Sequence, residues 1–356
     1  MLHSGILLTR VFTSRGQLPV ENAAVSVVLH SDSDRHTLLN IQTSDRSGNT
    51  LPTTIETPGV QNSQSPGQEA PFTLCDIWVE RSGYQPLTIQ NVQIFPGITS
   101  IQDLPLLPMT EAGEYSVEQV EITPQDLLER RCFMSITVTP YIPTNITVHL
   151  GPPDSPAENV TVPFREYIKN VASSEVYPTW HPAALRANIL AQVSFALNRI
   201  YTEFYPSRGY DFNITSSTAY DQKFIHGRNI FDSVSELVDD LFNNYLRRQG
   251  YVEPLAAGFC NGTTSTCNGL SQWGSENLAQ QGQSSVEIVH HYYGSDVEIV
   301  VDAPEQDIRY SYPGTPLREG DISPEVQVAQ VMLNRIAVAY PAIPQIQPVN
   351  GVFSSN

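Results

Sequence analysis

The sequence predicts a multidomain protein with an N-terminal β-sandwich, a central mainly helical α+β domain and a short C-terminal helical module. The chain has 356 residues, which is too long for one small core. Its hydrophobic period also changes: short alternating runs dominate before about residue 110, and helical spacing dominates after about residue 150. Between them, the Gly/Pro-rich residues 151–156 predict a stiff, polar break.

The N-terminal region, residues 1–110, is predicted to form the sandwich. Its β-branched or alternating runs predict strands at residues 6–12, 24–29, 75–79 and 88–94. Turn residues such as Gly48 and Gly83 separate these runs. The Gly/Pro/Ser/Gln-rich residues 57–71 predict a long, mobile loop. Residues 111–150 are predicted to be a connector that carries one or two strands, with a β-type alternation at residues 132–140.

The central region, residues 151–302, carries mostly helical patterns. They predict helices at residues 163–176, from His181-Pro182 to Phe204, and at 229–248, 272–281 and 285–293, followed by a strand at 297–301. Asn188 and Gln192 lie four apart at the edge of the second helix, where they can face a cleft. Ser284 and Glu287 predict a capping box. Residues 303–356 form the C-terminal module, with a helix at 326–339.

Glu175 is the most informative residue. It follows Val171 by four positions and Ile168 by seven, so helical spacing directs its carboxyl group toward the core. A buried carboxylate either finds hydrogen-bond donors or stays protonated. A protonated carboxylic acid in a cleft wall is what a glycosidic general acid must be. A structural glutamate bonded to the backbone is the alternative.

Composition excludes several function classes. The net charge of −18 argues against nucleic acid and anionic membranes as partners, because both require a basic surface. No apolar run approaches the ~20 residues of a membrane span, so no membrane insertion is expected. Residues 1–12 do not resemble an ordinary secretory signal. The Ser, Thr, Gln and Pro content before residue 130 nevertheless suits an extracytoplasmic protein.

The four cysteines are Cys75, Cys132, Cys260 and Cys267. The last two flank a polar loop that suits a small disulfide, and a disulfide or two free thiols is favoured over metal. Zinc would need ligands from His226, His290 or His291, without supporting spacing. No metal and no cofactor are therefore expected.

Three parts of the chain resemble known families. Residues 19–25 and 43–48, with Gly83-Tyr84, resemble the carboxypeptidase regulatory-like domain of transthyretin type, which implies a scaffold or an adaptor. Residues 307–353, ending in Gly351-Val352-Phe353, resemble the first half of a three-helix peptidoglycan-binding module.

The third resemblance covers the central region. Residues 166–175 and residues 269–274, joined by Gln222 and Gly227, resemble the catalytic domain of the stage II sporulation protein D family of peptidoglycan lytic transglycosylases. Two features depart from that family. Val193 replaces a common arginine, and residues 266–269 replace a glycine-histidine-glycine sequence.

The whole arrangement resembles the germination-specific spore-cortex-lytic enzymes, with residues 167–175 and 215–224 especially similar. This resemblance implies a precursor in the dormant spore (cortex or coat region) or extracytoplasmic wall, with peptidoglycan glycan strands as substrate. It also implies activation by a subtilisin-like protease in or near residues 114–150. The N-terminal domain would then be a pro-region or chaperone.

The resemblance assigns the catalytic role to Glu175. As an acid, Glu175 would protonate the glycosidic oxygen between N-acetylmuramic acid and N-acetylglucosamine. As a base, it would then take the proton of the muramoyl 6-hydroxyl and close a 1,6-anhydro ring. A hydrolytic glycosidase would normally need a second carboxylate. Asp221 is the other acid within a motif, and loop capping is an equal alternative for it.

Six further residues within or beside the motifs are predicted to bind the substrate. Sugar hydroxyl or acetamido groups would contact Tyr220, Gln222, Ser271 and Gln272, and sugar rings would stack on Tyr177 and Trp273. A helix cap or a core contact is the alternative for each, and Trp180 is predicted to be core. Two other functions stay open: a non-catalytic wall-binding or spore-structural protein that keeps the fold, and an adaptor whose β-domain binds another protein.

Overall fold

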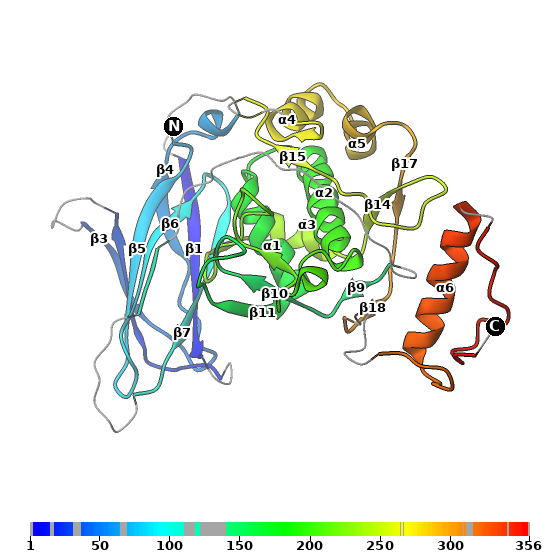
Figure 1. The fold of residues 1–356 in the computed structure, drawn as a ribbon. Coiled ribbons are helices and arrows are strands. Elements are labelled where there is room, and N and C mark those ends of the chain that lie inside the picture. The colour runs from blue at the N-terminus through cyan, green and yellow to red at the C-terminus, as the bar shows by residue number, and fades with distance from the viewer. Residues whose placement is uncertain are drawn as a thin grey trace.

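The computed structural model describes residues 3–14, 18–30, 37–64, 70–109, 118–121, 140–263, 265, 267–308, 310, 316–339 and 342–354. The chain has a mixed α+β fold, with large β-sheets in its N-terminal part and helices in its middle (Figure 1). The strand predicted at residues 132–140 lies outside the described residues, except for its last residue.

Two β-sheets in the N-terminal part share one hydrophobic core. Their strand orders are β3-β2-β5-β6-β8 and β13-β7-β1-β4. The strands are β1 His3–Thr13, β2 Ala24–Leu29, β3 Thr37–Thr43, β4 Thr53–Thr57, β5 Thr73–Glu80, β6 Leu87–Ile94, β7 Thr99–Leu106, β8 Glu118–Glu121 and β13 Ile230–Phe231. Leu7 and Leu104 of one sheet pack with Val25, Ile77 and Ile89 of the other. We call residues 3–109 the β-unit.

The β-unit confirms the strands predicted from the sequence and adds others. β1, β2, β5 and β6 coincide with the four predicted runs, whereas β3, β4 and β7 were not predicted. The prediction of a long loop at residues 57–71 was wrong in part. A short 3₁₀ helix, η1 (Val60–Ser63), lies there, and its Ser63 is buried against the central region.

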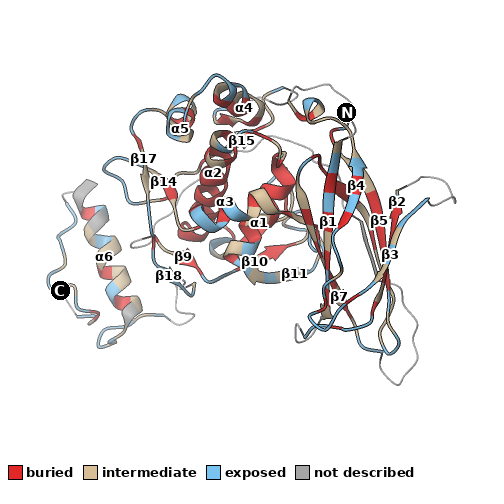
Figure 2. Ribbon diagram, turned by 180° about the vertical axis from the view of Figure 1, so that it is seen from behind, coloured by how far each residue is buried: buried red, intermediate tan, exposed pale blue. Residues whose placement is uncertain are grey.

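Helices packed around α2 form the central region. They are α1 Phe164–Glu175, α2 Pro182–Tyr201, α3 Asp232–Leu241, α4 Gln272–Gln280 and α5 Ser285–Tyr293, with a 3₁₀ turn, η2, at Pro206–Arg208. α2 contacts all four of the other helices and is buried along nearly its whole length (Figure 2). Its start at Pro182, with His181 as the N-cap, agrees with the sequence prediction.

Short strands complete the central region, which in the structure runs from Ile142 to Gln306 and so extends beyond the predicted residues 151–302 on both sides. They are β9 Ile142–Pro143 with β18 Glu305–Gln306, β10 Asn145–His149 with β11 Asn159–Pro163 and β12 Ile214–Thr215, β14 Tyr245–Arg248 with β17 Val297–Val300, and β15 Phe259–Cys260 with β16 Leu270–Ser271. Because β10 and β11 are antiparallel neighbours, residues 151–156 form the connection of a β-hairpin. The interpretation of these residues as a break was therefore wrong.

The helix predicted at residues 229–248 is much shorter. Ile230 and Phe231 pair with β7, α3 occupies only Asp232–Leu241, and Tyr245 begins a strand that pairs with β17. Apolar spacing in this segment fits a helix, but hydrogen bonds to distant strands fix both of its ends.

The C-terminal helix α6 (Pro324–Ala339) confirms the helix predicted there. The Gln330 side chain donates to the Val352 carbonyl at 2.9 Å, which ties the helix to the following segment. In Figure 1, α6 stands at the end of the molecule opposite the β-unit. Among the described residues, no helix is long and apolar enough to cross a membrane.

The capping box predicted at α5 is confirmed, and it makes the stability of the protein depend on pH. Hydrogen bonds from the Ser284 side chain and backbone hold the pKa of Glu287 below its ordinary value of 4.5. A lowered folded-state pKa stabilises the protein above the unfolded-state pKa, and this contribution is lost as pH falls through the folded-state value. We expect Glu287→Ala to destabilise the protein at neutral pH and progressively less below about pH 4.5. Denaturant unfolding at several pH values measures this, and a pH-independent difference would contradict it.

Candidate active site

Glu175 is the last residue of α1 and lies inside the protein. The apolar stripe of α1 is fully buried, and Glu175 follows it inward, with only 4% of its surface exposed. The helix ends here because Val176 takes an extended conformation ahead of Pro178. The sequence prediction that this carboxyl group points toward the core is confirmed.

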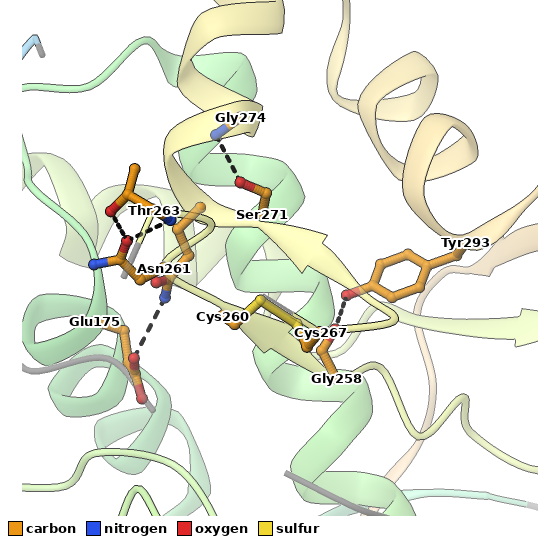
Figure 3. Close-up of a disulfide and its surroundings, with 10 residues drawn as sticks. Glu175, Gly258, Cys260, Asn261, Thr263, Cys267, Ser271, Gly274 and Tyr293 are labelled. Atoms are coloured by element: carbon orange, nitrogen blue, oxygen red, sulfur yellow. Dashed lines mark hydrogen bonds between the residues drawn. A yellow bond between two sulfur atoms is a disulfide. The ribbon is translucent and has the colours of Figure 1, made fainter. Parts of the chain in front are cut away.

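Two groups from distant segments hold the Glu175 carboxylate. The backbone N–H of Lys223 donates to Oε1 at 2.8 Å, and the Gln272 side-chain amide donates to Oε2 at 3.3 Å. Figure 3 shows Glu175 with a dashed line for this second bond, close to the loop between Cys260 and Cys267. The carboxyl group is thus bonded to two separate segments that follow it by 48 and 97 residues.

The start of α4 places Gln272 against Glu175. Ser271 is the N-cap, and its hydroxyl accepts from the Gly274 backbone N–H at 3.0 Å. The Trp273 backbone N–H donates to the Asn261 carbonyl at 3.2 Å, so the loop before α4 also fixes this first turn. Gly262 of that loop has φ +84°, and a Cβ there would lie 1.8 Å from the Ser271 hydroxyl oxygen.

Cys260 and Cys267 form a disulfide that closes this loop (Figure 3). Cys260 lies on β15, which is paired in parallel with β16, so the disulfide and the strand pair hold the loop beside the N-terminus of α4. The sequence favoured a disulfide or two free thiols for these two cysteines, and the structure has the disulfide. Among the described residues, Cys75 is a free, buried thiol.

Three aromatic side chains cluster together. Tyr177 and Trp180 follow Glu175 closely in sequence, and Trp273 follows Gln272. The ring centroids of Tyr177 and Trp180 are 5.7 Å apart, those of Tyr177 and Trp273 are 5.8 Å apart, and those of Trp180 and Trp273 are 5.1 Å apart. Trp180 is buried, as predicted for a core residue, whereas Tyr177 and Trp273 are half-buried. Burial raises the pKa of Tyr177, so the side chain stays a neutral hydroxyl. The two half-buried rings keep part of their surface accessible to solvent.

Asp221 is a structural brace. It has no exposed surface, and its carboxylate accepts from the guanidinium of Arg199 at 2.8 Å, from the Tyr205 hydroxyl, and from both the backbone and the hydroxyl of Thr215. Burial and the Asp221 charge raise the pKa of Tyr205. With four donors on two oxygens, Asp221 fits the loop-capping alternative and is fixed inside the fold.

The remaining predicted polar residues lie in different environments. Gln222 is buried, accepts from the Tyr167 hydroxyl at 3.0 Å and donates to the Gln192 carbonyl at 2.9 Å. Its sugar-binding role stays a prediction, but both of its amide atoms are bonded inside the protein. Tyr220 lies on the surface with 46% of its area exposed. The prediction that Asn188 and Gln192 face a cleft was wrong, because α2 is covered on every side and both are buried.

Sequence reasoning missed Glu276, a second buried carboxylate one turn after Gln272. Its Oε2 accepts from the His181 backbone N–H at 2.8 Å, and its Oε1 accepts from the Gln280 side chain at 2.7 Å. Glu276 thereby joins α4 to the first residues of α2. The signal was its i+4 spacing from Gln272 on a predicted helix, which places both side chains on one face.

Comparisons with known proteins assign no family. No family model matches the chain, and no curated protein matches it. Among solved structures, catechol 1,2-dioxygenase of Acinetobacter radioresistens is 14% identical, with a TM-score of 0.22, over 33% of this chain and 58% of that chain. Transthyretin from Sparus aurata is 11% identical, with a TM-score of 0.18, over 29% of this chain and 91% of that chain. Similarities this weak carry no conclusion about function.

Proposed function

We propose that this chain is a peptidoglycan lytic transglycosylase that acts on spore cortex or related wall, with Glu175 as its catalytic carboxylate. The observation that carries the proposal is the bond between Glu175 and Gln272. These residues belong to the two distant stretches on which the resemblance to the stage II sporulation protein D family rests. Two parts of one active site are expected to meet in this way, and the bond joins the two stretches through the carboxylate to which the resemblance assigns the chemistry.

The proposed reaction needs one carboxyl group. Glu175 gives its proton to the glycosidic oxygen as the bond from muramoyl C1 to that oxygen breaks, which releases N-acetylglucosamine as the alcohol. The Glu175 carboxylate then takes the proton of the muramoyl 6-hydroxyl while O6 bonds to C1. The proton returns to Glu175 and no water is consumed. Because the nucleophile belongs to the substrate, the fixed position of Asp221 is no obstacle.

Gln272 suits a carboxyl group that alternates between these two states. Its amide nitrogen donates to Glu175, while its amide oxygen is buried and has no hydrogen-bond partner among the described residues. An amide can present either its donor or its acceptor after rotating by half a turn. Gln272 can thus donate to the carboxylate and accept from the carboxylic acid.

The candidate site is closed in this structure, and nearby aromatic side chains could open it. Glu175 is almost fully buried, so a glycan strand reaches the carboxyl group only after a neighbouring side chain has moved. Tyr177 and Trp273 are half-buried, follow Glu175 and Gln272 closely in sequence, and can exchange their mutual contact for contact with a sugar ring. We assign them to substrate binding.

The finer assignments belong to the same proposal. The β-unit is a transthyretin-like, carboxypeptidase regulatory-like domain, and the C-terminal helix begins a partial peptidoglycan-binding module. The chain is a precursor of the germination-specific spore-cortex-lytic type, located in the spore or the extracytoplasmic wall. A subtilisin-like protease activates it by cleavage in the connector.

Muropeptide analysis tests the reaction. Full-length protein and protein cut in the connector are incubated with cortex peptidoglycan, and the soluble products are identified by mass spectrometry. We expect 1,6-anhydromuramoyl ends, with more product from the cut protein. Reducing ends would show hydrolysis and contradict the proposal.

The burial of Glu175 also favours a second candidate, a wall-binding protein that keeps the fold without the chemistry. Co-sedimentation with insoluble peptidoglycan separates the two functions. Binding by both forms of the protein, without soluble products from either, would support this second function.

A further inference from the structure

The β-unit and the central region share a β-sheet. Strand β13, from the central region, pairs antiparallel with β7 through Ile230 with Ile101 and Phe231 with Ser100. Side chains extend the contact on both flanks: Gln102 donates to the Gly227 carbonyl at 3.0 Å, and Asp232 accepts from the Thr99 backbone N–H at 3.3 Å. An edge strand of the β-unit is therefore completed by residues more than one hundred positions later in the chain.

Arg228 bridges this sheet contact to the catalytic helix. Its guanidinium donates to the Ser174 hydroxyl on α1 at 3.0 Å and to the Gln93 side-chain oxygen on β6 at 3.4 Å. Arg228 is only 4% exposed, and its printed bonds go to neutral acceptors, namely Ser174, Gln93 and the Asn229 carbonyl. Burial lowers its pKa to about 9, so at neutral pH a buried cation depends on these neutral acceptors. One of them is the residue beside Glu175, and another belongs to the β-unit.

Aromatic side chains join the hydrophobic core of the β-unit to that of the central region. Phe95, at the end of β6, is fully buried in the core of the central region. Its ring lies 5.2 Å from Phe231 and 5.8 Å from Tyr177, measured between centroids. In the opposite direction, Ile225 of the central region packs on the core of the β-unit. Separation of the β-unit from the central region would expose these side chains to water.

The η1 turn of the β-unit makes a fourth contact, next to the candidate site. The Ser63 carbonyl accepts from the Trp180 indole at 2.9 Å, and the Ser63 hydroxyl accepts from Thr179 at 2.6 Å. Gln64 accepts from Gln280 of α4 at 3.1 Å. The β-unit thus touches the loop after Glu175 and the helix that carries Gln272.

We propose that the β-unit remains bound to the central region as a non-covalent subunit when the connector is cut, with Arg228 as the positioning residue that joins it to the helix of Glu175. The cut chain would then consist of two associated pieces, and the N-terminal piece would help to hold the candidate site in place. The interface is built from the contacts above and does not depend on the glycosidic chemistry.

The test uses the full chain with a recognition sequence for a specific protease inserted between residues 122 and 139. After complete cutting, the protein is run on a size-exclusion column at concentrations from micromolar to nanomolar. We expect both pieces to elute together at the mass of the intact chain and to unfold in one thermal transition. Separate elution at micromolar concentration would overturn the proposal.

Matched variants assign the role to Arg228. In the cut protein, we expect Arg228→Met to raise the dissociation constant between the pieces by at least ~10-fold, since it leaves buried acceptors without donors. Arg10→Met is the control, because Arg10 pairs with Asp103 on the exposed surface of the β-unit. Equal effects of both variants would overturn the role of Arg228.

A second pair covers the case in which Arg228→Met does not fold. Gln93→Leu removes the side-chain acceptor that the β-unit offers to Arg228, and Gln93→Glu replaces it with a charged one. We expect the first to weaken the association and the second to preserve or tighten it. The opposite order would contradict the proposal. None of these measurements uses peptidoglycan, so their outcome does not depend on the proposed enzymatic activity.

Discussion

Replacing Glu175 with glutamine is expected to abolish the formation of 1,6-anhydromuramoyl ends. Glutamine keeps the size of the side chain and can still accept from the Lys223 backbone, but it cannot give or take the proton. Loss of a general acid–base group lowers a rate by about 10²- to 10⁴-fold. Product formation from cortex peptidoglycan measures this, with far-UV circular dichroism to establish that the variant is folded.

Glu276→Gln is the matched control for this experiment. Glu276 is also a buried glutamate at the edge of the site, but it bonds to the α2 N-terminus and to Gln280. We expect the rate of this variant to remain within about a factor of ten of wild type, with its loss limited to positioning. Activity of Glu175→Gln near the wild-type level would contradict the catalytic assignment. Equal loss in both variants would show that the effect is structural.

Removal of the Asp221 carboxylate is expected to destabilise the fold severely. Asp221→Ala leaves the buried guanidinium of Arg199 without its counter-charge, and the Tyr205 hydroxyl loses its acceptor. Breaking one side of a buried ion pair costs about 3–5 kcal/mol of unfolding free energy. Urea denaturation measures this, provided that the transition remains two-state.

An exposed ion pair in the same region is the control for Asp221. Asp240 on α3 pairs with Arg186 on α2 at 2.9 Å, and both side chains are accessible to water. Asp240→Ala should cost about 0–1 kcal/mol. If Asp221→Ala instead left stability unchanged and removed activity, Asp221 would be a second catalytic carboxylate, and the one-carboxylate account would be wrong.

Local patterns predicted those elements whose formation depends on nearby residues. The α5 helix has its expected bounds because Ser284 and Glu287 cap it within one turn. The inward direction of Glu175 followed from the regular spacing of α1. In each case the determining contacts span only a few positions, so the sequence contains the whole signal.

Contacts between distant segments explain what the sequence did not reveal. Ile230 and Phe231 fit a helical pattern but form a strand, because β7 offers a free edge about 130 positions earlier. Asn188 and Gln192 were expected at the edge of their helix, where they could face a cleft, whereas α2 is surrounded by other elements. The brace role of Asp221 required knowing where Arg199 lies.

The origin of the oxygen at the newly formed muramoyl end tests the central claim most directly. Digestion of cortex peptidoglycan is run in water enriched in heavy oxygen, and the new ends are analysed by mass spectrometry. If Glu175 activates the substrate's own 6-hydroxyl, the new ends contain no heavy oxygen. One heavy oxygen atom at C1 of each new end would show that water is the nucleophile and would contradict the account.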